Sequence, residues 1–404
     1  MTPIDRSPPR RPPLPILTSL RFFAAAEVIL YHFGRMTDVD LVALYFGNRL
    51  TSFPGNFFQI ATSAGHEAVT FFFVLSGFIL TYVYAGSAES QGFAGKRSDF
   101  WWARFARIAP TFYLGLLLSL PFLLYSVFVV RSVAVSQLIT SLVLAPAFLQ
   151  SWWPPTVYLW NFPSWSLSVE FFFYVLFPLL AGAAALVPRR HLLVLALAFV
   201  VSMAFVRDAL LVRFSTAPDP AHSFAIYFPV LSLPQFVLGI ALARLFLHGP
   251  TLSPRAGKAI LLAGLAGVVV IFGWQSDLPP WLGWLKTEAG TVGILFGAII
   301  FGAAGAAGSF GILESRALVF LGDASYSMYI LHIPISLWWK WASTKVLHLS
   351  LPPLLNFAVM VALVVAIAAV NQAYVEPPLR RFLLRRRARI APLASASSSK
   401  GSIE

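Results

Sequence analysis

The stretch Leu17–Phe33, LTSLRFFAAAEVILYHF, is an apolar run of membrane-spanning length with an arginine near its start and a histidine near its end. Arg21 and His32 are eleven positions apart, so in an α-helix they lie within about 20° of the same face and about 16 Å apart along the axis. A cation and an imidazole are costly to place on one stripe of a membrane helix. The spacing therefore predicts that this stripe forms the wall of a reaction site.

The composition of the whole chain indicates a membrane protein. Of its 404 residues, 58% are hydrophobic and 11% are charged, and several runs reach the length that spans a bilayer. The absence of cysteine excludes disulfides, thiolate metal sites and a cysteine nucleophile. Much of the net charge of +13 lies beside the ends of apolar segments, where the positive-inside rule explains it, so nucleic acid is not an expected partner.

Ten segments are predicted to span the membrane. They lie at about 14–33, 68–86, 108–130, 168–187, 191–212, 225–247, 258–274, 290–309, 318–340 and 354–374. An eleventh candidate at 133–149 would place the basic C-terminal tail outside the cell if it spanned. We therefore expect 133–149 to be a partial, re-entrant or interfacial element.

The predicted fold is an all-α integral membrane bundle of about ten transmembrane helices with both termini in the cytoplasm. Three regions follow from this prediction. Residues 1–13 form a proline- and arginine-rich cytoplasmic N-terminus, residues 14–379 form the transmembrane domain, and residues 380–404 form a tail that is first basic and then disordered.

The second segment contains VTFFFVLSGFIL, in which Ser76 and Gly77 interrupt a bulky apolar run. Small residues in membrane helices most often permit close helix packing. A serine nucleophile would need an adjacent base, which a sequence does not reveal. We therefore interpret Ser76 as a residue that lines a site.

The third segment begins with SDFWWARFARIAP, where Arg104 and Arg107 stand three positions apart on one helix face, just inside the cytoplasmic boundary. Basic residues at such a boundary are ordinary topology signals. Two forked guanidinium groups on one face also suit a polyanion, so the alternative is a clamp for phosphate groups.

The fourth segment opens with WSLSVEFFFYVLFP, where Glu170 is almost the only polar residue beyond the first turn. The helix dipole favours a carboxylate at this end. In a low-dielectric setting the same group can pair with an imidazolium or fix the tautomer of a histidine base. Trp165 closes the stretch 150–165, which is rich in tryptophan and proline and is typical of an interfacial aromatic belt. The alternative is that this stretch shapes the mouth of a site.

The ninth segment reads LGDASYSMYILHIPI and places Ser325, Tyr329 and His332 on one polar stripe at i, i+4 and i+7. Such hydroxyl groups can tie helices together. A second histidine inside the membrane also suggests hydrogen bonding to a substrate. Glu376, near the cytoplasmic end of the last span, is expected to be structural.

Taken together and in this order, these stretches resemble the membrane acyltransferase-3 family, which includes bacterial O-acetyltransferases of surface polysaccharides and lipopolysaccharide. Arg21 with His32 is similar to the family's signature of an arginine, ten residues and a histidine. FFFVLSGF around Ser76 is similar to its second-helix motif, and RFARIAP to its paired-arginine motif.

Two later motifs extend the resemblance. WSLSVEFFFY with Glu170 is similar to the family's tryptophan-serine-leucine-glutamate motif, and SYSMYILH with Tyr326, Tyr329 and His332 is similar to its late tyrosine and histidine helix. The resemblance runs over about 17–380, nearly the whole chain. Each motif is short, and it is their common order and spacing that indicate the family.

The resemblance implies an enzyme that takes an acyl group from cytoplasmic acyl-CoA, with acetyl-CoA as the expected donor, and delivers it to a hydroxyl group of a cell-surface or exported carbohydrate or glycolipid. No metal is expected. The implied roles are donor binding by Arg21, Arg104 and Arg107, catalysis by His32 and Glu170, and substrate binding by Ser76, Trp165, Tyr326, Tyr329 and His332. His32 would act as general base or as a transient acyl carrier.

The resemblance also implies a location and partners. The chain is expected to be a multi-pass protein of a bacterial inner membrane, in contact with the lipid bilayer, acyl-CoA and a carbohydrate acceptor. Because the sequence ends soon after its last span, without a fused esterase-like domain, a separate extracytoplasmic transferase is an expected partner unless the acceptor is reached directly.

A different class of function is a proton-coupled transporter or flippase of a glycan or lipid-linked substrate. Its charges inside the membrane would form a proton relay, and an inverted repeat with broken helices would be its signature. We find no such repeat in the sequence. The acyl chain and the acceptor remain open at this point.

Overall fold

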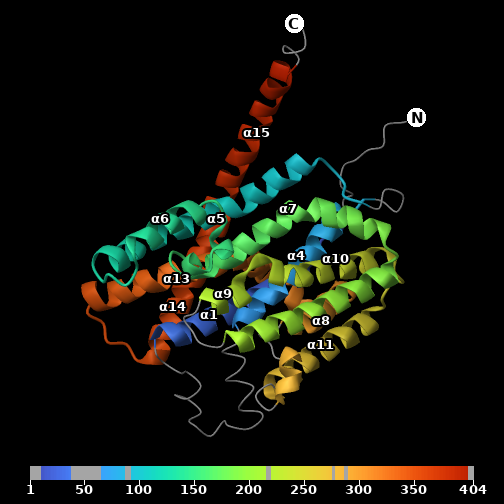
Figure 1. The fold of residues 1–404 in the computed structure, drawn as a ribbon, viewed down its shortest axis with the longest axis horizontal. Coiled ribbons are helices and arrows are strands. Elements are labelled where there is room, and N and C mark those ends of the chain that lie inside the picture. Colours follow the sequence, from blue (N-terminus) through green and yellow to red (C-terminus); the bar gives the residue numbers. More distant parts are fainter. Residues whose placement is uncertain are drawn as a thin grey trace.

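The computed structural model describes residues 11–37, 65–86, 92–214, 220–274, 278–285 and 290–398. Within these ranges the chain is mainly helical, and the extended pairing consists of one isolated bridge between Ala85 and Phe93. Figure 1 shows helices lying side by side in a bundle, from which α15 extends away. The predicted all-α class is confirmed.

Nine helices in the described ranges are long and apolar enough to cross a membrane. Each coincides with a predicted span. In chain order they are α1 (Pro15–Thr37), α4 (Gly65–Tyr84), α5 (Arg97–Phe128), α7 (Trp165–Leu186), α8 (Arg189–Arg213), α9 (Pro220–Tyr227) continued by α10 (Leu233–His248), α11 (Pro254–Trp274), α13 (Arg316–Trp341) and α14 (Pro353–Val370).

Two shorter apolar helices lie in the segments that remain, which are the predicted span 290–309 and the eleventh candidate 133–149. The tenth predicted span is α12 (Val292–Gly305), which has 14 residues and packs against α4, α10 and α11. Helix α6 (Val135–Leu144) lies in the disputed segment and has ten residues. At 1.5 Å per residue it is about 15 Å long, half the thickness of a bilayer core. It is therefore too short to span, as the distribution of basic residues predicted.

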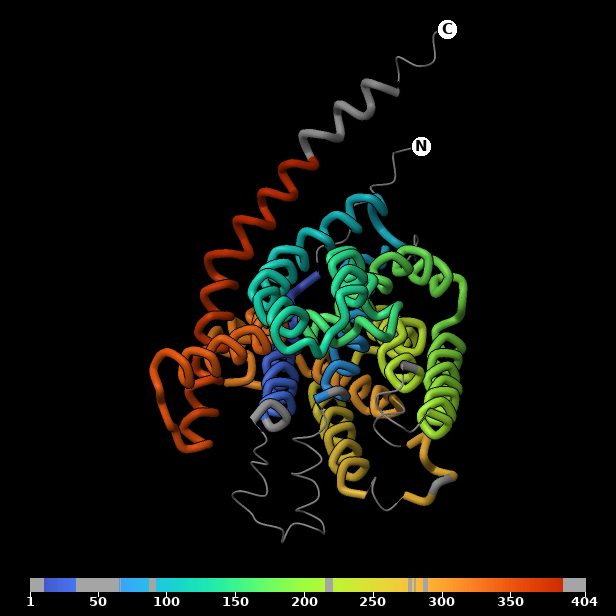
Figure 2. The backbone as a smooth tube through the Cα atoms, turned by 60° about the vertical axis from the view of Figure 1, so that its left-hand side comes forward, coloured from blue at the N-terminus to red at the C-terminus, as the bar shows by residue number. Residues whose placement is uncertain are grey.

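Helix α1 packs against both α4 and α13, and α4 packs against α10. Figure 2 shows α1 (blue) running through the middle of the bundle. Glycines permit these close approaches. A Cβ atom at Gly77 in α4 would overlap the carbonyl oxygen of Phe236 in α10, and one at Gly322 in α13 would overlap that of Thr18 in α1. The packing role expected for Gly77 is thus confirmed, and α1 presents its polar residues to helices on two sides.

A single turn of π-helix, Asn371–Val375, joins α14 to α15 (Glu376–Ser398). Helix α15 contacts the start of α5, where the indole of Trp102 donates to the carbonyl oxygen of Leu383. Helix α15 continues to Ser398, within the tail of residues 380–404 that the sequence analysis expects to be first basic and then disordered; the disorder of that tail stays a prediction.

We predict that Gly77→Val destabilises the protein, because the added side chain would meet the Phe236 carbonyl and force α4 and α10 apart. Overpacking of this kind costs about 1–3 kcal/mol. The measurement is the thermal unfolding midpoint of the detergent-purified protein. Gly182→Val is the matched control, since a Cβ atom there has no heavy atom within 4 Å. Equal midpoints for the two variants would contradict the proposed contact.

Candidate functional site

Seven of the ten predicted site residues line one cavity of about 180 Å³ between α1, α4, α5, α7 and α13. They are Arg21, Ser76, Arg104, Arg107, Glu170, Tyr326 and Tyr329. We call this space the arginine cavity. Three guanidinium groups and a single carboxylate, that of Glu170, line it, so it is suited to an anionic ligand.

Arg104 and Arg107 have different surroundings, although they are one turn apart. Arg104 lies over the rings of Tyr84 and Phe100, at 5.6 and 5.9 Å from the ring centroids, and donates to the Tyr84 hydroxyl at 3.3 Å. Its Nε atom is buried and makes no hydrogen bond to the part of the chain that the structure describes. Arg107 forms an ion pair with Glu376. Arg104 is therefore the better placed of the two to receive an anion from outside the chain.

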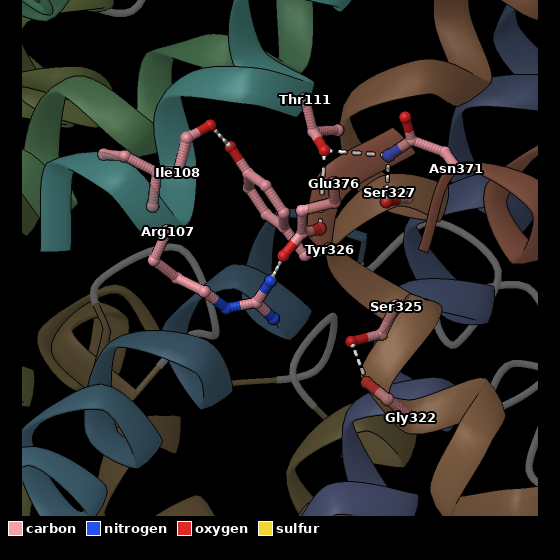
Figure 3. A network of polar contacts seen from close by, with 9 residues as sticks. All are labelled: Arg107, Ile108, Thr111, Gly322, Ser325, Tyr326, Ser327, Asn371 and Glu376. Carbon is pink, nitrogen blue, oxygen red and sulfur yellow. Dashed lines mark hydrogen bonds and ion pairs between the residues drawn. The ribbon is translucent and has the colours of Figure 1, made fainter. Parts of the chain in front are cut away.

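Figure 3 shows the polar network around Arg107. The second carboxylate oxygen of Glu376 lies 3.5 Å from the Thr111 hydroxyl, which also accepts a hydrogen bond of 2.8 Å from the amide of Asn371. The Tyr326 hydroxyl donates to the carbonyl oxygen of Ile108 at 2.6 Å. These bonds tie α5, α13 and α15 together. The contacts of Glu376 with Arg107 and Thr111 agree with the structural role expected for it. Tyr326 likewise holds α13 against α5.

Glu170 lines the arginine cavity. Within the described chain it makes no contact with His32, the partner that the sequence analysis expected for it. Its carboxylate accepts hydrogen bonds from Tyr174 at 2.5 Å and from Ser76 at 3.3 Å. Arg21, which is partly buried, lies within electrostatic reach of Glu170 and of Asp323. The carboxylates therefore offset the charge of Arg21. Tyr174 was missed by the sequence analysis, although its i+4 spacing from Glu170 was a signal for it.

Tyr329 joins the cavity to the segment before α7. Its hydroxyl donates to the carbonyl oxygen of Pro163 at 3.0 Å and accepts from Ser166 at 2.8 Å. Trp165, the first residue of α7, is buried against Phe73 and Tyr227 and does not line the cavity. Its predicted substrate contact therefore has no support in this arrangement.

His32 and His332 lie together, outside the lining of the arginine cavity. The Nε2 atom of His332 is 3.1 Å from Nδ1 of His32, and both rings are buried. Each Nδ1 atom also faces a backbone carbonyl, that of Val28 at 2.9 Å for His32 and that of Tyr329 at 2.8 Å for His332. A carbonyl oxygen only accepts, so each Nδ1 carries a proton. In the neutral pair, Nε2 of His332 accepts from His32, and the lone pair of His32 is on its Nε2 atom.

The histidine pair lies directly beyond the arginine cavity. Tyr329 lines the cavity and accepts a hydrogen bond from His332, which follows it by three residues, about 4.5 Å along the axis of α13. On α1, Arg21 lines the cavity and His32 lies about 16 Å further along the same helix. The stripe predicted from the first helix thus runs from the arginine cavity to the histidine pair.

A second polar cluster inside the bundle was also missed. Glu67 in α4 and Arg207 in α8 are buried and lie within electrostatic reach of each other, and Glu27 in α1 lies near Glu67. Arg207 also donates to the Ser232 hydroxyl at 3.1 Å. Charged residues within apolar runs were the available signal for this cluster.

The chain matches the family described as "Acyltransferase domain" over residues 15–370. It is 31% identical to the acyltransferase MdmB of Streptomyces mycarofaciens, over 96% of this chain and 96% of that protein. It is 23% identical to the O-acetyltransferase OatA of Staphylococcus aureus and 24% identical to the putative peptidoglycan O-acetyltransferase YrhL of Bacillus subtilis, each over 91% of this chain. It spans only 57% and 55% of the length of those two proteins. No solved structure matches.

The helical bundle with an arginine-lined cavity is therefore that of a multi-pass membrane acyltransferase. The chain belongs to the membrane acyltransferase-3 family, and the resemblance inferred from its five motifs is confirmed. Its relatives are bacterial proteins, and they include O-acetyltransferases. The membership favours acyl transfer over the transporter alternative.

We predict that Glu376→Ala destabilises the fold by about 3–5 kcal/mol, because it leaves the guanidinium of Arg107 without its countercharge in a mostly buried site. The measurement is equilibrium unfolding in mixed detergent micelles. Asp99→Ala is the matched control, because it breaks an exposed ion pair with Arg387 whose side chains are 63% and 26% exposed. That change should cost no more than about 1 kcal/mol. Equal losses would show that burial does not distinguish the two pairs.

Proposed function

We propose that this chain is an integral membrane O-acyltransferase that moves an acyl group, with acetyl as the expected one, from cytoplasmic acyl-CoA to a hydroxyl group of an exported or cell-surface carbohydrate. The observation that carries the proposal is the continuity of an arginine-lined cavity with a buried histidine pair along α1 and α13. The homology to O-acetyltransferases supports the reaction class.

Arg104 would hold a phosphate group of the donor, since its Nε atom is a buried donor without a partner in the described chain. Arg107 would add positive potential, although Glu376 neutralises part of its charge. Arg21 lies deeper along α1 and would guide the uncharged arm of the donor toward the histidines. The distance of about 16 Å from Arg21 to His32 is comparable to the reach of an extended pantetheine arm.

His32 would act as the general base through Nε2. It would take the proton of the acceptor hydroxyl while the oxygen attacks the thioester carbonyl carbon. The bond between carbon and sulfur then breaks, the acyl ester forms, and the CoA thiolate takes the proton from His32, which returns to its neutral form. The neighbouring His332 would hold the productive tautomer by accepting from Nδ1 of His32.

Glu170 would act on the donor side and not as the direct partner of His32. Its contacts with Ser76 and Tyr174 fix the cavity wall, and its charge balances Arg21. Tyr329, whose hydroxyl is already bonded to Pro163 and Ser166, would position the junction between the cavity and the histidine pair. These assignments leave substrate hydrogen bonding by Ser76 and Tyr326 as a prediction.

We predict that Arg104→Ala raises the KM for acetyl-CoA about 10- to 100-fold, because it removes a hydrogen bond to a charged group. His32→Ala should lower kcat about 10²- to 10⁴-fold while acetyl-CoA binding is retained. The measurement is transfer of radiolabelled acetyl groups to an envelope glycan extract by protein in nanodiscs. Arg97→Ala is the matched control, since Arg97 is an exposed arginine of the same helix outside the cavity. Wild-type activity in the His32 variant would remove the base assignment.

The tautomer assignment predicts different effects for two substitutions of His332. Glutamine keeps a side-chain acceptor for Nδ1 of His32, whereas leucine removes it. We expect His332→Leu to lose kcat about 10- to 100-fold, which is comparable to the effect of losing the hydrogen bond that orients a metal-binding histidine. His332→Gln should retain most of it. Thermal stabilisation by acetyl-CoA should be unchanged in both variants. Equal loss in both would argue against orientation through this bond.

A further inference from the structure

A second cavity, of about 290 Å³, lies between the end of α1, the second half of α13 and the start of α14. We call it the α13–α14 cavity. Six of its twelve lining side chains are polar: Ser336, Lys340, Ser343, Thr344, Ser350 and Asn356. The hydroxyl groups of Ser336, Ser343 and Thr344 donate to carbonyl oxygens of α13 and keep lone pairs that can accept, while the Lys340 ammonium and the Asn356 amide nitrogen can donate to a ligand. None of the twelve lining residues is acidic, so an anionic substituent on the ligand would also be tolerated.

Trp339 and Asn356 form the fixed part of this cavity. The indole Nε1 of Trp339 donates to Oδ1 of Asn356 at 2.7 Å. This bond holds the large aromatic side chain of α13 against α14 and turns the donor end of the amide away from the indole. The cavity thus combines an immobilised aromatic surface with a directed hydrogen-bond donor, which is how small-molecule sites fix orientation.

The wall between α13 and α14 has an irregular backbone. A π-helical turn, Ala342–Val346, follows α13 and carries Ser343 and Thr344 into the lining. His348, a few residues further, has a φ of 48°, in the left-handed region that non-glycine residues rarely adopt. Single π-helical turns and strained residues occur often at functional sites. The segment that connects α13 to α14, part of which lines the cavity, thus combines a π-helical turn with a left-handed residue.

The cavity adjoins the histidine pair. Phe33, which lines it, directly follows His32 in α1. Ser336, which also lines it, donates to the carbonyl oxygen of His332 at 2.6 Å. It therefore lies next to the histidines, at the end of α1 away from Arg21. The donor and a second ligand could approach the pair from different cavities.

We propose that the α13–α14 cavity binds a pyranose ring of the acceptor, with its C–H face on Trp339 and its hydroxyl groups on Asn356 and Ser343. This inference rests on the proposed acyltransferase function and adds the acceptor subsite. A lipid chain would make no hydrogen bonds to this lining, whereas a sugar offers donors to the hydroxyl oxygens and acceptors to the Lys340 ammonium and the Asn356 amide nitrogen. The volume is at the lower end of small-molecule sites, which fits a single sugar ring.

The test measures binding without turnover. Saturation-transfer NMR would follow methyl β-D-glucopyranoside, methyl β-D-galactopyranoside and methyl N-acetyl-β-D-glucosaminide added to the full-length protein in nanodiscs. Trp339→Ala and Asn356→Ala would be compared with wild type. Trp338→Ala is the matched control. Trp338 is the exposed neighbour of Trp339, its indole donates to the carbonyl oxygen of Leu118, and it does not line the cavity. Thermal stabilisation by acetyl-CoA would show that each variant is folded.

We expect at least one glycoside to give a saturation-transfer signal with the wild type and with Trp338→Ala. That signal should fall at least fivefold in Trp339→Ala and in Asn356→Ala. The proposal is overturned if no glycoside binds the wild type, or if the signal survives in both cavity variants. Acetyl transfer to the same glycosides is measured in parallel. Sugar binding at this cavity without any acetyl transfer would contradict the proposed function and leave the sugar site standing. Acetyl transfer with a KM for the glycoside that is unchanged in both cavity variants would contradict the sugar site and leave the proposed function standing.

Discussion

Charge inside an apolar bundle has to be compensated, and this constraint organises the structure. Removing a guanidinium from water is costly unless an anion or several acceptors replace the water. Arg107 meets the carboxylate of Glu376, and Arg21 lies near Glu170 and Asp323. Arg104 has aromatic rings and a single tyrosine hydroxyl around it. Its buried Nε atom has no hydrogen-bond partner in the described chain, and Arg104 lines the arginine cavity, where an anionic ligand could supply the compensation.

Close helix contact makes this arrangement possible. The glycines at 77 and 322 let α4 and α13 approach their neighbours until backbone meets backbone. Helix α1 is held between them, so its Arg21 and His32 side chains reach residues that come from distant parts of the sequence. The chemistry proposed here depends on that central position more than on any single polar group.

Much of this was accessible from the sequence, because it depends on local spacing. The length of the apolar runs predicted the membrane spans, and the distribution of basic residues argued against a full span at 133–149. The separation of eleven residues between Arg21 and His32 predicted the polar stripe on α1. The contact between His32 and His332 was not accessible, because it joins residues 300 positions apart. For the same reason Glu170 was assigned to His32, whereas its hydrogen bonds in the folded chain are to Ser76 and Tyr174. Periodicity identifies a face of a helix but not what the face meets.

The π-helical turn before α15 has an electrostatic consequence. An extra residue in a helical turn rotates everything that follows it by about 100° relative to a regular helix. Glu376 is the first residue after that turn, and it reaches Arg107 from there. The same helix carries the cluster of arginines at 380–387 and leaves the bundle. The countercharge of Arg107 and the arginines at 380–387 are thus parts of one helix. A displacement of α15 that carried Glu376 away from Arg107 would therefore make the arginine cavity more positive.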